Sequence, residues 1–354
     1  MSLYERVVRP ALFLLPAETA HNLGKRALSV EFPWRVQAKR FQVPDPRLET
    51  EVAGIRQVSP IGLTAGFDKD ALALPGLSHL GFGSLTVGAI MPEPRAGNPK
   101  PRLMRRPVER ALVNCMGLPS KGLAYAVRKL RRYREAHPSG DPPIIANVGG
   151  FTVEEILSCF RAVEPLVDAV ELDLTCPNVK VEGELAEMEG IVRAMKGVLA
   201  ERKKPVLTKL PLRSSDEDWR RALDMSVAAA EVGLDGITAG GSLRVEESRV
   251  SMGKGSLTGP PVLENTLRIV RDLRSAVGDR LTIRISGGAA DGDGAFRLLE
   301  AGADAVNVLT AFVYQGPAVA ARMNRGLLRK MDEAGVRSVR ELKSRPSVST
   351  AAAR

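Results

Sequence analysis

Short apolar segments alternate with amphipathic helical patterns over most of the 354-residue chain. Helical patterns such as residues 216–232 and 262–277 fall between most of the apolar segments. The segments that predict strands are residues 61–66, 84–90, 144–150, 169–175, 205–211, 235–241, 282–288 and 305–311. Strands that alternate with helices indicate a parallel α/β sheet, and eight of them are the number that a TIM (β/α)8 barrel requires.

The first thirty residues predict two short amphipathic helices that break at Pro16. Val7, Val8 and Leu12 share an apolar face, and Arg6 lies beside it. This pattern suits a lid packed on the barrel, and it suits equally a helix pair that touches a membrane interface or admits an apolar co-substrate. No apolar run reaches the roughly 20 residues that a membrane-spanning helix needs.

We therefore expect an N-terminal two-helix extension (1–45), the barrel (46–335) and a disordered tail (336–354), which becomes small and polar from residue 344. After a polar connection, residues 51–60 predict a hairpin with Gly54 near its bend. A long insertion, residues 91–133, carries Asn114 and is expected to cover the mouth of the barrel as a loop.

The chain is basic, with 51 Lys and Arg against 41 Asp and Glu, a net charge of +10 and a pI near 9.7. Such an excess suits an anionic substrate, an anionic membrane surface or nucleic acid. Aromatic residues make up 4% of the chain, which leaves little material for base stacking, so no nucleic-acid partner is expected. The three cysteines form neither a disulfide framework nor a paired zinc-ligand spacing, which favours a reducing, cytoplasmic compartment.

Cys176 and Asn178 follow directly on the predicted strand 169–175, and Pro177 ends its pairing because it has no N–H to donate. Both residues therefore fall at a strand's carboxyl edge, where parallel α/β proteins keep their chemistry. The cysteine is either catalytic or a buried packing residue, and this stretch alone does not decide between them.

Polar residues and glycines also follow most of the other strands. Lys69 follows the first strand, Asn147 lies in the third, and Lys209 lies in the fifth. Glycine pairs end the sixth and seventh strands, and the loops after the last two strands are where barrels usually bind phosphate. Two lysines together with these turns favour an anionic, phosphate-bearing cofactor.

Several motifs resemble those of the dihydroorotate dehydrogenases, which are FMN-dependent TIM-barrel enzymes. The resemblance covers about residues 4–320, and residues 5–28 look like the paired helices of the membrane-associated, quinone-linked class. The motifs are 60–70 (PIGLTAGFDKD), 80–88 (LGFGSLTVG), 99–103 (PKPRL), Asn114 with Met116 and Gly117, 173–180 (DLTCPNVK), 255–260 (GSLTGP) and 286–288 (SGG).

The resemblance implies a role for each matching position. Cys176 would act as the general base on the substrate while hydride passes to the flavin, and Lys209 would support that catalysis. Asn114, Asn178, Asp173 and Lys69 would contact a dihydropyrimidine-like substrate. The FMN would be bound by Ala65, Gly66, Lys69, Asn147, Asp173, Lys209, Gly259, Gly287, Gly288 and Thr310. A quinone would enter through residues 3–30, with the protein cytoplasmic or peripheral on the inner face of the cell membrane.

Three departures from the family pattern keep alternatives open. The base is Cys176, as in the soluble classes, where the quinone-linked class is expected to have serine. Asp173 replaces a substrate asparagine, and Gly240 with Gly241 replaces another. An ionised aspartate can only accept hydrogen bonds and repels an anionic substrate, so the alternatives are a different dihydropyrimidine or cyclic enone as substrate, or a catalytically idle flavin-binding protein. A tRNA-dihydrouridine synthase fits less well, because only a short tail follows the barrel.

Overall fold

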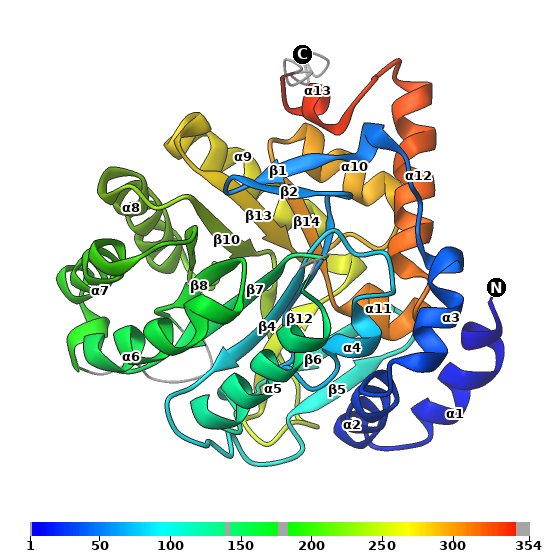
Figure 1. Cartoon of the computed structure of the whole chain (residues 1–354), viewed down its shortest axis with the longest axis horizontal. Coiled ribbons are helices and arrows are strands. Elements are labelled where there is room, and N and C mark those ends of the chain that lie inside the picture. The colour runs from blue at the N-terminus through cyan, green and yellow to red at the C-terminus, as the bar shows by residue number, and fades with distance from the viewer. Residues whose placement is uncertain (1, 139–141, 176–182, 345–354) are drawn as a thin grey trace.

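A closed barrel of eight parallel strands forms the centre of the protein, as the alternating pattern predicts (Figure 1). The computed structural model describes residues 2–138, 142–175 and 183–344. The barrel strands, in chain order, are β3 (Ile61–Asp68), β4 (Leu85–Ile90), β7 (Ile144–Gly149), β8 (Ala169–Asp173), β9 (Val206–Lys209), β10 (Gly236–Gly240), β13 (Thr282–Ser286) and β14 (Ala305–Val308). Strands β4, β7 and β8 are buried over their whole length, as expected where helices cover the sheet.

Amphipathic helices cover the outside of the barrel. In α6 (Val153–Val163) the side chain of Thr152 accepts a hydrogen bond from the Glu155 N–H and fixes the start of the helix. The buried residues of α6 recur at helical spacing, at Ile156, Cys159, Phe160 and Val163. The other covering helices are α5 (Leu123–Ala136), α7 (Met188–Glu201), α8 (Asp216–Val232), α9 (Leu263–Val277), α10 (Gly292–Glu300) and α12 (Val319–Glu333). Helices α8 and α9 confirm the two that the sequence predicts.

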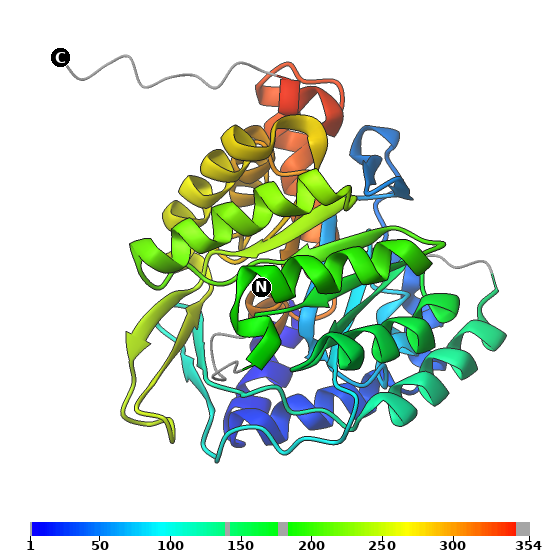
Figure 2. The ribbon, with the colours of Figure 1, turned by 90° about the vertical axis from the view of Figure 1, so that its left-hand side faces the viewer.

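A four-stranded antiparallel sheet lies at the mouth of the barrel, with the order β11-β12-β6-β5. Its strands are β5 (Leu103–Arg106), β6 (Ala111–Asn114), β11 (Leu243–Glu246) and β12 (Lys254–Thr258). The insertion of residues 91–133, expected as a covering loop, thus supplies two strands and most of helix α5. Figure 2 shows this sheet at the same end of the barrel as the N-terminal helices.

The N-terminal segment packs beside this mouth. A helical turn η1 (Tyr4–Val8), α1 (Arg9–Phe13) and α2 (Ala17–Leu28) confirm the helical prediction and its break at Pro16. A third helix, α3 (Phe32–Phe41), occupies part of the stretch expected to be a polar connection. That expectation was wrong because Pro33 stands in the first turn of a helix, where its missing N–H costs nothing. Within the described residues, none of the helices is long and apolar enough to cross a membrane.

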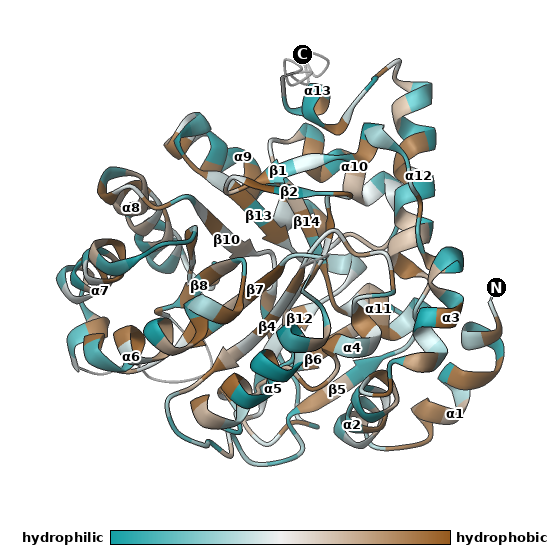
Figure 3. Ribbon diagram, viewed as in Figure 1, coloured by the Kyte–Doolittle hydropathy of each residue, from teal (hydrophilic) through white to brown (hydrophobic). Residues whose placement is uncertain are grey.

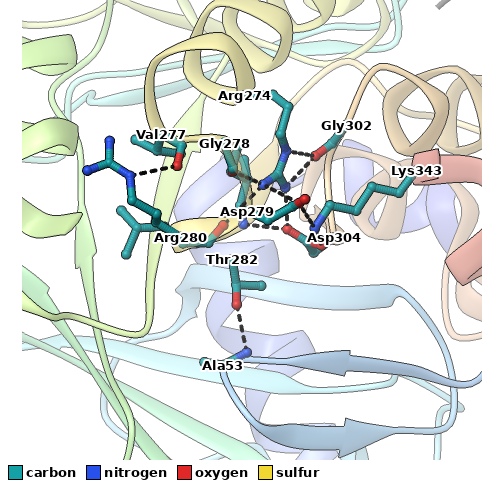
Figure 4. A network of polar contacts seen from close by, with 12 residues as sticks. Ala53, Arg274, Val277, Gly278, Asp279, Arg280, Thr282, Gly302, Asp304 and Lys343 are labelled. Carbon is teal, nitrogen blue, oxygen red and sulfur yellow. Dashed lines mark hydrogen bonds and ion pairs between the residues drawn. The ribbon is translucent and has the colours of Figure 1, made fainter. Parts of the chain in front are cut away.

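The opposite end of the barrel carries the hairpin of β1 (Thr50–Val52) and β2 (Ile55–Gln57), which confirms the predicted bend. Figure 4 shows how this end is held together. Arg274 Nη2 and Lys343 Nζ bind the two oxygens of Asp304 at 2.6 and 3.0 Å. Lys343 belongs to α13 (Val339–Ser344), in which Leu342 is fully buried. Residues 336–344 were expected to be part of a disordered tail, and this helix corrects that boundary, while residues 345–354 lie outside the described part.

Candidate functional site

A single cavity of about 1310 Å³ opens at the carboxyl ends of the barrel strands and continues between the N-terminal helices. It is lined by residues from all eight barrel strands. The eleven predicted site residues that the structure describes all line it: Ala65, Gly66, Lys69, Asn114, Asn147, Asp173, Lys209, Gly259, Gly287, Gly288 and Thr310. Cys176 and Asn178 lie outside the described residues, so their roles stay predictions.

Lys69 directly follows β3, within which Gly66 has a φ of 100°. Its Nζ donates a hydrogen bond of 2.6 Å to the Gly66 carbonyl. Burial, together with the neighbouring Lys25 ammonium, lowers the pKa of Lys69 to about 8. An anion bound beside Lys69 would favour its charged form, so this side chain is suited to hold an anionic group.

Asp173 and Lys209 form an ion pair across adjacent strands, with Lys209 Nζ 2.7 Å from Asp173 Oδ2. The carboxylate is buried while the lysine remains partly exposed in the cavity. Burial raises the pKa of Asp173, and the Lys209 ammonium opposes this shift. The aspartate thus has its own counterion, which removes much of the repulsion toward an anionic substrate that its sequence position suggests.

A second charged layer lies inside the barrel beneath this pair. Arg284 Nη1 donates to Glu171 Oε2 at 2.8 Å, and both side chains are about 1% exposed. Asn147 Nδ2 donates to the other carboxylate oxygen of Glu171 at 2.8 Å, so this layer orients a residue that lines the cavity. Sequence reasoning missed both residues, although a charged residue between apolar neighbours in a buried strand is a signal that could have found them.

Backbone turns with little side-chain cover form another wall of the cavity. Gly259, Gly287 and Gly288 adopt φ values of 114°, 100° and 87°, which favour glycine. A Cβ on Gly288 would lie 2.5 Å from the Leu263 Cα, so this position has no room for a side chain. The Thr310 hydroxyl lies beside them, 2.7 Å from the Thr258 hydroxyl. Backbone N–H groups and hydroxyls at such turns are suited to bind a phosphate.

The outer part of the cavity is lined by the N-terminal segment, which is tied to the barrel mouth by polar contacts. Arg102 Nη2 donates to Glu18 Oε1 at 2.6 Å, and Tyr4 Oη donates to the Val313 carbonyl at 2.7 Å. His21 of α2 lines the cavity, packs edge-on against Phe67, and was not singled out from the sequence. Burial lowers the pKa of His21 well below its ordinary value, and the Lys69 ammonium lowers it further. A neutral imidazole therefore faces the passage to the outside.

Comparisons with known proteins agree with this geometry. Residues 47–331 match the family model described as dihydroorotate dehydrogenase. A protein of Rhodococcus opacus named dihydroorotate dehydrogenase (quinone) is 35% identical, with 95% of this chain and 97% of that protein covered. A protein of Mycobacterium marinum with the same name is 33% identical, with 95% of each covered.

The solved structures agree as well. The crystal structure of a dihydroorotate dehydrogenase from Eimeria tenella, in complex with ferulenol, superimposes with a TM-score of 0.76 and 26% sequence identity, covering 93% of this chain and 96% of that one. Fold, cavity lining and sequence relatedness therefore converge, and the chain belongs to the dihydroorotate dehydrogenase family.

Proposed function

We propose that this protein is an FMN-dependent oxidoreductase that oxidises dihydroorotate to orotate and passes the electrons to a quinone. One observation carries the proposal: the same cavity joins the predicted cofactor residues at the barrel mouth to the N-terminal helices. A site for ring chemistry and a passage for an apolar acceptor are thereby continuous. The names of the relatives support the same activity.

The residues that line the cavity fit FMN. Asn147 Oδ1 and Asp173 Oδ1 are buried and have no hydrogen-bond partner among the residues that the structure describes, so a ring N–H could supply the missing donor. Lys69 and Lys209 provide cationic groups, and the turns at Gly259, Gly287 and Gly288 provide a wall suited to a phosphate. When bound, FMN would accept a hydride from the substrate and release electrons to the acceptor.

The chain's own residues would bind, orient and deprotonate the substrate. Lys69 would favour an anionic ligand, while the Glu171 carboxylate fixes the Asn147 amide at 2.8 Å. Asn114, whose Nδ2 donates to the Ser256 carbonyl at 3.3 Å, would present its amide to the substrate. Cys176, the proposed base, would take a proton from a substrate carbon, and its role rests on the family motif alone.

The Asp173–Lys209 pair favours dihydroorotate over a cationic substrate. A cationic ring would have to compete with Lys209 for the Asp173 carboxylate, from which the Lys209 Nζ lies 2.7 Å away. Asp173 and Lys209 together add no net charge to the site. The pocket can therefore accept an anionic pyrimidine in spite of the replaced asparagine.

The N-terminal segment is proposed to contact a membrane, from which the quinone would enter. Of the twelve large hydrophobic side chains exposed in the described residues, nine lie between residues 3 and 36. They include Leu14, which is 88% exposed, and Phe32, which is 65% exposed. Figure 3 shows apolar stretches on α1 at the outer edge of the molecule. Apolar side chains next to basic residues are typical of helices that lie in a membrane interface.

The test is anaerobic reduction of the purified, FMN-loaded full-length protein by dihydroorotate, followed through the loss of flavin absorbance. We expect full bleaching within seconds and reoxidation on addition of a short-chain quinone. Fumarate and NAD⁺ serve as alternative acceptors. The matched control is a C176A variant, which should bind FMN but whose flavin dihydroorotate should reduce at least a hundredfold more slowly. The substrate assignment would be contradicted if dihydroorotate left the flavin oxidised while another dihydropyrimidine or an enone reacted with it.

A further inference from the structure

Two of the chain's three histidines converge on one carboxylate outside the catalytic cavity. Glu31 Oε1 lies 3.0 Å from His79 Nε2 and 3.2 Å from His137 Nε2. One atom from each of the three side chains lies within 4.8 Å of the others. None of these residues lines the cavity at the barrel mouth, so the proposed oxidation does not explain the cluster.

Each of the three residues stands at the end of a different helix, where the backbone fixes its position. Glu31 directly precedes α3, and its side chain makes no capping hydrogen bond. His79 follows α4 (Leu74–Leu77), and His137 ends α5, where its N–H donates to the Tyr133 carbonyl. The three side chains are 18–28% exposed, so the cluster is largely enclosed but reachable from solvent.

The hydrogen-bond pattern around His137 leaves a place for a proton or a metal ion between its ring and Glu31. Its Nδ1 lies 3.0 Å from the Tyr133 carbonyl oxygen, which can only accept a hydrogen bond. Its Nε2 faces the Glu31 carboxylate oxygen, which also accepts when ionised. A neutral imidazole donates from one nitrogen only, so either a second proton or a metal ion must lie between the ring and the carboxylate. His79 Nε2 approaches the same Glu31 oxygen, so three atoms that can bind a metal ion surround this point.

We propose that Glu31, His79 and His137 bind a divalent transition-metal ion of the zinc class, with water as the fourth ligand. Zinc bonds of about 2.0–2.2 Å in a tetrahedron separate neighbouring ligand atoms by about 3.4 Å. The distances of 3.0 and 3.2 Å would therefore have to grow by a few tenths of an ångström, and the ligand atoms of the two histidines already lie within 4.8 Å of each other. Imidazole nitrogens favour zinc over calcium or magnesium, and the Tyr133 carbonyl holds the second nitrogen of His137 as metal sites require.

The ion would join the N-terminal segment to the barrel. Glu31 belongs to the segment whose helices line the outer cavity, whereas His79 and His137 belong to the connections between β3 and β4 and between β4 and β7. The segment is already packed there, since a Cβ on Gly76 of α4 would lie 2.5 Å from the Leu28 carbonyl. Metal binding would therefore stabilise this contact.

The test is equilibrium dialysis of the FMN-loaded full-length protein against Zn²⁺ after treatment with a chelator, with metal analysis and the melting temperature as readouts. We expect one zinc ion per chain that is bound at least tenfold more tightly than in Glu31→Gln or His137→Gln. We also expect the melting temperature to rise by about 3–4 °C at a free zinc concentration a hundredfold above Kd. Glu201→Gln, which changes an exposed carboxylate paired with Arg161, is the matched control and should bind zinc like the parent.

Equal zinc affinity in the parent and the two site variants would overturn the proposal, because the ion would then bind elsewhere, for example at a thiol. No binding by the parent would overturn it as well and would leave a second proton as the cation. Zinc X-ray absorption of the parent does not depend on any variant. Two imidazoles with oxygen in the first coordination sphere would support the site, and sulfur there would refute it.

Discussion

The buried ion pair between Glu171 and Arg284 gives the sharpest test of how the site is supported. Glu171 accepts hydrogen bonds from Arg284 Nη1 at 2.8 Å, from Asn147 Nδ2 at 2.8 Å, and from the Thr238 hydroxyl. In Glu171→Gln the shape is kept but the charge is lost. The guanidinium of Arg284, about 1% exposed, would be left without its counterion.

Removing one partner of a buried pair costs about 3–5 kcal/mol. Unfolding entropy of about 2.1 cal/mol/K per residue gives about 0.74 kcal/mol/K for 354 residues, so the melting temperature should fall by about 4–7 °C. Differential scanning calorimetry of the FMN-free protein measures this fall without a contribution from ligand binding. Affinity for FMN should fall as well, because the glutamine in Glu171→Gln would offer one acceptor oxygen, not two, to Asn147, Thr238 and Arg284, which disturbs the group that orients Asn147.

Two variants separate this explanation from a general effect of substitution. Glu201→Gln removes one partner of the exposed pair with Arg161, whose side chains are 39% and 47% exposed, and should shift the melting temperature by no more than about 1 °C. The double variant Glu171→Gln with Arg284→Met should recover part of the loss, since no uncompensated charge remains. A fall below 1 °C in the single variant, or no recovery in the double one, would refute the reasoning.

Three further predictions concern the cavity and the N-terminal segment. In Asp173→Asn the carboxylate beside the Lys209 ammonium is lost, so the FMN midpoint potential should rise by roughly 20–50 mV in dye-coupled titrations. An unchanged potential would show that the Asp173 charge does not act on the flavin. Burial lowers the pKa of Lys69 to about 8, so the side chain loses its positive charge as the pH rises through 8. The affinity of the cofactor-free protein for FMN should therefore fall by up to tenfold per pH unit above 8. Lys69→Met should flatten this profile, and a flat parent profile would contradict it. Leu14→Ser with Phe32→Ser should weaken flotation with anionic liposomes at least fivefold at an unchanged melting temperature, and equal flotation would leave the segment a packing role only.

Much of the fold was predictable because its signals are local. Each barrel strand is an apolar segment bounded by turn residues, and all eight predicted strands are confirmed. Helix α3 was missed because its basic residues and Pro33 look like a connection, while its stability comes from packing of residues such as Phe41. Helix α13 was missed for the same reason, since burial of Leu342 depends on contacts that no local pattern shows.

The candidate site was predictable residue by residue, but not in its pairings. Motifs placed Asp173 and Lys209 at the ends of strands, and treating Asp173 by itself led to the expectation of repulsion. In the barrel, Leu172 of β8 is in register with Thr208 of β9, so the next residue of each strand brings Asp173 beside Lys209. The register follows from barrel closure rather than from either strand. An aspartate at this position is therefore acceptable only while its neighbour is a cation, and substitutions at the two positions are expected to have strongly non-additive effects on both stability and FMN binding.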